Sequence, residues 1–130
     1  VDYLLKPLDG RRLREAVARS PFHVAGTGRF DTRVMDRLGE RVFCKVGAEG
    51  VYCAALPGQG LGVAIKIDDG NTARAAEVVL AAVIESLVSL DEAERGFMRR
   101  FSEVPLLNCN GTRIGALQAS AGLREALPVS

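Results

Sequence analysis

A lysine inside an apolar stretch is the residue of this sequence whose chemistry stands out most. In "VFCKVGAEG" (residues 42–50), Lys45 has apolar neighbours and is followed by Gly47 and Gly50. A charged side chain among apolar residues costs free energy unless a partner or a function requires it. A lysine fixed on a strand, with a glycine beside it, can serve a substrate that lies against the backbone. The pattern is therefore compatible with a catalytic lysine.

Structural explanations for Lys45 remain open beside the functional one. The side chain could extend its charged end from a sheet edge into water, or it could pair with a carboxylate such as Glu49. A Lys-X-Gly strand also occurs in serine β-lactamases and penicillin-binding proteins, as their Lys-Thr-Gly element. Three residues alone do not decide between these alternatives.

The elements that must position Lys45 are three short apolar runs. These runs are residues 41–47, 51–56 and 61–67. The breaks between them, "AEG" and "PGQG", have the length of hairpin loops, which predicts an antiparallel meander. In this register Lys45 lies opposite Cys53, and Cys53 lies opposite Ala64.

The two faces of the predicted meander differ in side-chain size. Lys45 shares its face with small residues, namely Gly47, Cys53, Ala55, Gly62 and Ala64. The other face carries bulky residues, namely Val42, Val46, Tyr52, Leu56, Val63, Ile65 and Ile67. The bulky face suits packing against an amphipathic helix expected at 72–88, and the small face leaves room for another layer or a ligand.

Capping and turn signals predict the remaining elements. They are a strand at 1–5 and helices at 10–18, 32–38 and 91–101. Asp9 and Asp31 are the expected N-caps of the helices at 10–18 and 32–38. The pair Asn110-Gly111 predicts a two-residue type I′ hairpin. We expect an α+β fold with an antiparallel meander flanked by helices.

Composition excludes several classes of function. Seventeen basic and 16 acidic residues give a net charge of +1, so nucleic-acid binding is not expected. Three widely spaced cysteines (Cys44, Cys53 and Cys109) argue against a disulfide framework and match no zinc pattern, which favours a cytoplasmic location. No signal peptide or membrane-spanning stretch is evident. Since the first residue is Val, we expect the chain to be part of something longer.

Four motifs, taken together, resemble a known family. They are "SPFHVAGTGRFDTRVM", "VFCKVGAEGVYCAALPGQGLGVAIKIDDG", "RAAEVVLAAV" and "LLNCNGTRIGAL", in this order. They closely resemble the C-terminal part of the asparaginase II family, the rhizobial-type L-asparaginases, over roughly residues 14–117. The resemblance implies a fold like that of serine β-lactamases and penicillin-binding proteins, and hydrolysis of L-asparagine to L-aspartate and ammonia.

The resemblance also implies roles for particular residues. In the family, a nucleophilic serine and its partner lysine lie in Ser-X-X-Lys motifs near the N-terminus, and a further lysine lies on a Lys-X-Gly-Ala-Glu strand. Lys45 matches that lysine, so it would accept the serine's proton or keep the neighbouring lysine neutral through like-charge repulsion. Gly47 shapes the strand beside it. Thr27, Gly28 and Arg29 could line the substrate pocket, with Arg29 gripping the α-carboxylate of asparagine.

Two departures from the family pattern modify these expectations. None of the six serines has a lysine three residues on, so we expect the chain to be inactive alone and to need a missing N-terminal half or a second copy, as a homodimer. Some family members have a zinc-binding cysteine in the "GTGRFDT" region, where this chain has Asp31. Zinc is therefore implied only by the resemblance, and Asp31 is either a helix cap or a metal ligand.

The N-terminal stretch permits a second interpretation. "VDYLLKPLDGRRLREAV" is similar to the last strand and helix of a response-regulator receiver, with Lys6 as its lysine. The acidic pocket that a receiver needs is not in this sequence. We therefore expect residues 1–19 to be a strand-helix segment that could be a receiver-like remnant, and residues 20–130 to be the C-terminal part of an asparaginase II-like domain. The alternative function is a receiver-like signalling or interaction module without catalysis.

Overall fold

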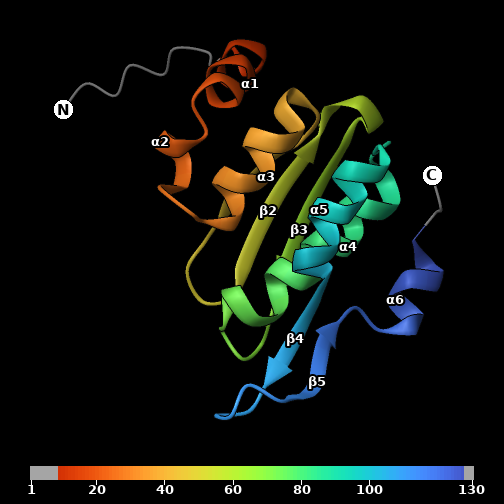
Figure 1. Ribbon diagram of the computed structural model, residues 1–130. Helices are drawn as coiled ribbons and strands as arrows, with labels where there is room; N and C mark the ends of the chain where they lie inside the picture. The colour runs from red at the N-terminus through yellow and green to blue at the C-terminus, as the bar shows by residue number, and fades with distance from the viewer. Residues whose placement is uncertain (1–8, 128–130) are drawn as a thin grey trace.

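A three-stranded antiparallel meander forms the centre of the molecule, and helices cover one of its faces (Figure 1). The computed structural model describes residues 9–127. The strands are β1 (Phe43–Val46), β2 (Val51–Leu56) and β3 (Leu61–Lys66), in the order β1-β2-β3. The protein is therefore a mixed α and β protein, as predicted. The more specific likeness to serine β-lactamases stays a prediction.

The predicted register of the meander is confirmed. Lys45 pairs with Cys53, and Cys53 pairs with Ala64. The first loop has three residues, as expected, and the Gly47 N–H donates to Val51 O at 2.8 Å across it. Gly50 is required there because its φ is +71° and an added Cβ would lie 2.7 Å from the Ile67 carbonyl oxygen. Loop length thus determines which side chains share a face with Lys45.

The four predicted helices are present, and the structure adds two others. They are α1 (Gly10–Arg19), α2 (Phe22–Ala25), α3 (Phe30–Leu38), α4 (Glu77–Leu87), α5 (Glu92–Ser102) and α6 (Ala121–Ala126). Short 3₁₀ turns lie at η1 (Gly39–Arg41) and η2 (Pro57–Gln59), and the helix expected at 72–88 begins with a π-helical turn, η3 (Thr72–Ala76). Asp9 caps α1 as expected, since its side chain accepts from the N–H groups of Arg11 and Arg12. The sequence analysis does not predict the four-residue helix α2 or the six-residue helix α6.

The core lies between the bulky face of the meander and the helices. The sheet contributes Val42, Cys44, Tyr52, Ala54 and Leu56, and Val63 and Ile65 pack against this cluster. The expected helix contributes Ala76, Leu80, Ala81 and Ile84. Phe30, Val34, Met35 and Leu38 of α3 belong to the same core, so two helices share the face that we had expected one to cover.

Asp31 does not cap α3, so that prediction is wrong. The helix begins at Phe30, which places Asp31 in its first turn, and the Arg29 that precedes the helix makes no side-chain cap. Asp31 is 1% exposed, as part of the interior. Its carboxylate accepts hydrogen bonds from Val46 and Tyr52 of the sheet and not from the first turn of the helix.

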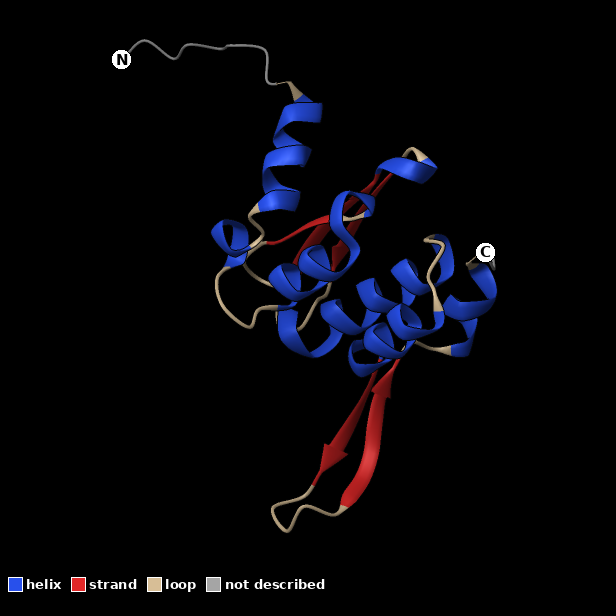
Figure 2. Ribbon diagram, turned by 45° about the horizontal axis from the view of Figure 1, so that its top comes forward, coloured by secondary structure: helices blue, strands red, loops and turns tan. Residues whose placement is uncertain are grey.

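The prediction of a type I′ turn at Asn110-Gly111 is also wrong. The strands β4 (Glu103–Leu107) and β5 (Arg113–Gln118) form a hairpin that extends away from the helices (Figure 2). Its loop is longer, because the Asn108 side chain accepts from the N–H groups of Asn110 and Thr112. Of the two expected turn residues, only Gly111 has a positive φ. The asparagine before the pair therefore determines this turn.

The N-terminal predictions fall largely outside the described residues. The strand at 1–5 and Lys6 belong to the part of the chain that the structure does not describe. From α1, Val17 packs against the core. The boundary after residue 19 and the receiver-like interpretation stay predictions.

Candidate active site

Lys45 lies on the exposed face of the meander, on the edge strand β1. Its Nζ donates to the carbonyl oxygen of Val46 at 2.8 Å, and it forms no ion pair with any residue that the structure describes. Glu49 is not its partner, and the backbone oxygen of Glu49 accepts from Lys66 instead. The structure therefore does not show the pairing with Glu49, and Lys45 extends from a sheet edge. The lysine presents an ammonium group beside small side chains.

Gly47 has a clear local reason for lacking a side chain. An added Cβ would lie 3.2 Å from the Cβ of Val51, its neighbour across the loop, which is closer than most real contacts of that kind. The glycine thus lets the hairpin close tightly next to Lys45. Gly47 is exposed, so the strand backbone beside the lysine is open to a ligand.

A buried carboxylate lies directly under the strand that carries Lys45. Asp31 Oδ2 accepts from the N–H of Val46 at 3.0 Å, and the Tyr52 hydroxyl donates to Oδ1. One side chain of α3 therefore holds both β1 and β2. Because Val46 follows Lys45 directly, Asp31 fixes the strand at the position that aims the lysine.

The electrostatics connect Asp31 with Lys45 and Arg29. Burial raises the pKa of Asp31, while the Val46 N–H and the charges of Lys45 and Arg29 act in the opposite direction. Burial also raises the pKa of Glu77, with Arg29 opposing and Asp31 reinforcing that shift. Two acidic and two basic groups therefore interact in one region, at the junction of α3, β1 and α4.

The residues expected to line the substrate pocket lie in the loop between α2 and α3. Thr27, Gly28 and Arg29 are all exposed, and Gly28 has a φ of +72°. Arg29 belongs to the charge group described above, since its charge opposes the raised pKa of both Asp31 and Glu77. No hydrogen bond among the described residues joins Thr27 or Gly28 to Lys45. Of the three, Arg29 is the one that the structure links to the lysine's surroundings.

The described residues do not fit a zinc ion. No three side chains of His, Cys, Asp or Glu within residues 9–127 gather as a metal site requires. Both oxygens of Asp31 already accept hydrogen bonds. Burial, reinforced by the charges of Asp31 and Glu77, raises the pKa of Cys44, whereas zinc binds the thiolate.

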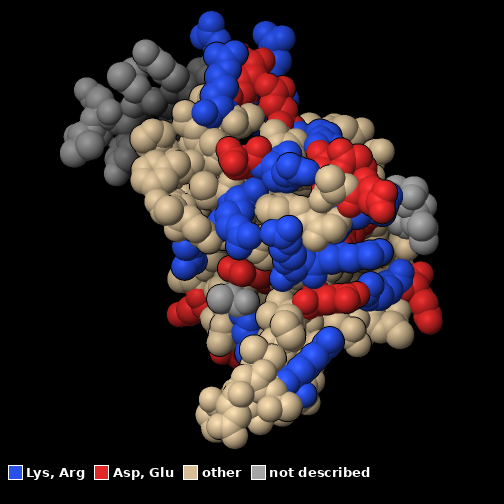
Figure 3. Space-filling view, viewed as in Figure 1, with Lys and Arg blue, Asp and Glu red and all other residues tan. Residues whose placement is uncertain are grey.

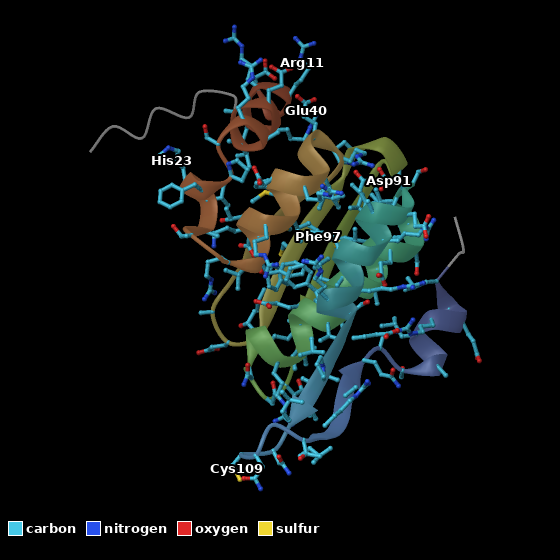
Figure 4. All side chains as sticks on the ribbon, in the orientation of Figure 1. Arg11, His23, Glu40, Asp91, Phe97 and Cys109 are labelled. Carbon is cyan, nitrogen blue, oxygen red and sulfur yellow. The ribbon has the colours of Figure 1, made fainter. Side chains whose placement is uncertain are left out.

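Sequence reasoning missed Tyr52 and Glu77 as members of this group. Tyr52 was placed on the bulky face, where it does lie, 1% exposed. A buried tyrosine needs a partner for its hydroxyl, and that requirement could have pointed to a buried carboxylate. Glu77 lies in the first turn of α4, where an acidic residue needs no special explanation. The only histidine, His23, is exposed on α2 and stacks edge-to-face with Phe22 (Figure 4).

Taken together, the structure describes a mixed α and β protein whose sheet presents an exposed lysine above a buried carboxylate. The model of the L-asparaginase II family matches residues 6–119, which include this sheet and the loop of Arg29. The chain belongs to the L-asparaginase II family. No curated protein matches it. Within the described residues, no helix combines the length and the apolar character that crossing a membrane would need.

Proposed function

We propose that this chain supplies part of the active site of an L-asparaginase, which hydrolyses L-asparagine to L-aspartate and ammonia. The observation that carries the proposal is the match to the L-asparaginase II family over a sheet on which Lys45 stands exposed and without an ion-pair partner among the described residues. A lysine on a rigid strand suits proton transfer, because the strand holds its side chain in position.

Lys45 acts on a nucleophile that these 130 residues do not contain. A serine from a Ser-X-X-Lys segment attacks the side-chain amide carbon of asparagine, and its hydroxyl proton passes to a lysine amine. Lys45 either takes that proton itself or, while charged, keeps the neighbouring lysine neutral. The leaving nitrogen receives a proton and departs as ammonia. Water then hydrolyses the acyl-enzyme to aspartate and regenerates the serine hydroxyl.

Two other residues support this chemistry. Asp31 is a positioning residue, because its bond to the Val46 N–H holds the strand at Lys45. Arg29 is exposed in the loop at the start of α3 and can form a bidentate pair with the α-carboxylate of the substrate. Thr27 and Gly28, in the same loop as Arg29, and Gly47, next to the strand of Lys45, would line the substrate pocket.

The exposed face of the meander is where the segment with the serine would dock. Lys45, Cys53, Gly62 and Ala64 are all exposed there, and small side chains permit close approach. The docking segment with the serine is an N-terminal half of the same enzyme. A second copy of the chain, in a homodimer, would bring other residues beside Lys45 but no Ser-X-X-Lys motif. We propose a cytoplasmic location for the assembled enzyme.

Ammonia release from L-asparagine tests the proposal. We expect no measurable turnover by the 130 residues alone and clear turnover once a family segment with Ser-X-X-Lys is joined or added, because nucleophile, base and oxyanion site act as a unit. L-Glutamine, one methylene longer, should react more slowly by about 10–200-fold. Turnover by the 130 residues alone would show that the nucleophile lies within them.

A further inference from the structure

A second group of charged residues surrounds a cavity formed by α4, α5, α6 and the start of β4, and no residue of the meander lines it. The cavity has a volume of about 240 Å³. Its polar lining consists of Glu85, Ser86, Arg95, Arg99, Glu103 and Arg124. Figure 3 shows acidic and basic side chains lying together over α5 and α6. The proposed asparaginase chemistry uses none of these residues.

Two of the three arginines at the cavity have no ion-pair partner among the described residues. Arg95 and Arg99 lie four residues apart on α5, so they project from the same side of the helix. Neither forms an ion pair with any residue that the structure describes. Arg124, on α6, approaches Glu103 at 3.8 Å. Two guanidinium groups at the cavity therefore keep their hydrogen-bond donors available.

Glu85 provides the opposite charge from the floor of the cavity. Its Oε1 is buried and has no hydrogen bond of ordinary geometry, and the same is true of Ser102 Oγ. Burial raises the pKa of Glu85, while Ser102, Arg124 and Arg99 act against that shift. The carboxyl group of Glu85 therefore has a buried oxygen without a partner among the described residues, and its side chain lines the cavity, where it can meet a ligand.

We infer that this cavity binds a free α-amino acid as its zwitterion, as a site separate from the Lys45 face. The ligand's carboxylate pairs with Arg95 and Arg99, and its ammonium group donates to Glu85 and Glu103. A simple anion would meet two carboxylates, and a simple cation would meet three guanidinium groups. Only a ligand with both charges matches the lining.

The volume limits the size of the ligand. Pockets that enclose drug-sized molecules span about 300–1,000 Å³, and this cavity is below that range. It therefore suits an amino acid with a short side chain, such as alanine. The inference does not depend on the proposed asparaginase activity, because binding can be measured without turnover.

An NMR titration of the ¹⁵N-labelled 130-residue chain with L-alanine tests the site. We expect saturable shifts for the Arg95 and Arg99 side-chain N–H groups and for the backbone around residue 85. N-Acetyl-L-alanine lacks the ammonium group and L-alaninamide lacks the carboxylate, so each should bind at least about tenfold more weakly. No saturable shift, equal binding of either derivative, or equal binding of sulfate would overturn the inference.

Variants localise the binding. Glu85→Gln and Arg99→Gln should each weaken L-alanine binding by about tenfold or more, whereas Arg113→Gln, which changes an exposed arginine of β5, should leave it unchanged. If Glu85→Gln does not fold, Arg99→Gln still tests the site, because Arg99 is exposed and its replacement should leave the fold intact. Lys45→Ala should also leave L-alanine binding unchanged. Equal effects of the Arg113 and Arg99 variants, or lost binding in Lys45→Ala, would contradict a separate site.

Discussion

The two faces of the meander come from the same three strands and differ in almost every physical property. The helix-covered face is apolar and packs over one carboxylate, that of Asp31 on α3, whose oxygens both accept hydrogen bonds. The exposed face has small side chains around an ammonium group, on Lys45, that lacks an ion-pair partner among the described residues. On the covered face the carboxyl group serves the fold through its hydrogen bonds, and on the exposed face the amino group is available for chemistry.

Burial gives different roles to two ionisable groups that lie close together, because Asp31 contacts the residue that follows Lys45. Asp31 reaches the backbone of Val46 from below, and Lys45 precedes Val46 on the other side of the sheet. A buried charge is tolerated only with hydrogen-bond partners, so Asp31 is structurally constrained. Lys45 has no such constraint. Changes at the two positions should therefore separate stability from activity.

Removal of the Asp31 carboxylate should produce the largest effect on folding. Asp31→Ala leaves the Val46 N–H and the Tyr52 hydroxyl without their buried acceptor, and each such loss costs about 1–3 kcal/mol. We expect the free energy of unfolding to fall by about 2–5 kcal/mol in urea denaturation. Lys45→Ala, on the exposed face, should change it by no more than about 0.5 kcal/mol.

Asp31→Asn is the matched control for this loss. The amide oxygen can accept from Val46, and the amide nitrogen can donate to the Tyr52 hydroxyl, so both contacts survive. This variant should lose much less stability than Asp31→Ala. Equal losses in the two variants would show that the negative charge itself, rather than the hydrogen bonds, stabilises the sheet.

The reactivity of the cysteines should distinguish the two faces directly. Cys44 is fully buried on the covered face, and burial raises its pKa, whereas Cys53 is exposed on the other face. A thiol reagent should modify Cys53, and Cys109 in the β4–β5 loop, at least about 100-fold faster than Cys44. Cys53→Ser and Cys109→Ser assign the fast phases. Protection of Cys53 alone would show that another segment or a second copy covers the exposed face.

The pH dependence of stability should sharpen the role of Asp31. Its pKa in the folded protein is raised above the ordinary value of 3.8, so the folded state binds more protons than the unfolded state in the interval above that value. The stability contributed by protonated Asp31 is therefore fully present below about pH 4 and is lost as the pH rises through the folded pKa. The unfolding free energy of the wild type, relative to Asp31→Asn, should fall across that interval.

Glu77 and Glu85 also have raised pKa values and contribute in the same direction, so only the difference between wild type and variant isolates Asp31. Both proteins would be unfolded in urea at a series of pH values. A difference that rises with pH, or that does not change, would contradict the assignment of burial as the dominant cause.

The sequence was sufficient for the meander and insufficient for the charges beneath it. The lengths of the "AEG" and "PGQG" loops determine the register, and strand alternation then determines the faces, so the pairing of Lys45 with Cys53 could be predicted. The covering helix was predictable from its apolar stripe. These features depend on local periodicity, which the sequence contains.

Asp31 could not be placed in this way. In sequence it precedes a helical pattern and fits an N-cap, but its actual partners, Val46 and Tyr52, lie 15 and 21 residues away. The tertiary contacts outweigh the local capping preference because burial makes hydrogen bonds to the carboxylate obligatory. The turn at Asn110-Gly111 failed for a related reason, since the side chain of Asn108 supplies hydrogen bonds that the dipeptide rule does not consider.

The central claim is that Lys45 serves catalysis rather than the sheet. The most direct measurement is ammonia release from L-asparagine by the complete enzyme, with the serine segment present, for Lys45→Ala and for Lys66→Ala. Lys66 is also an exposed lysine of the meander, on β3, and provides the matched control. We predict that Lys45→Ala loses at least about 100-fold in turnover, because an acid–base group contributes that much or more, and that Lys66→Ala remains close to wild type. Full activity in Lys45→Ala would contradict the claim and leave the lysine as a charged residue at a sheet edge.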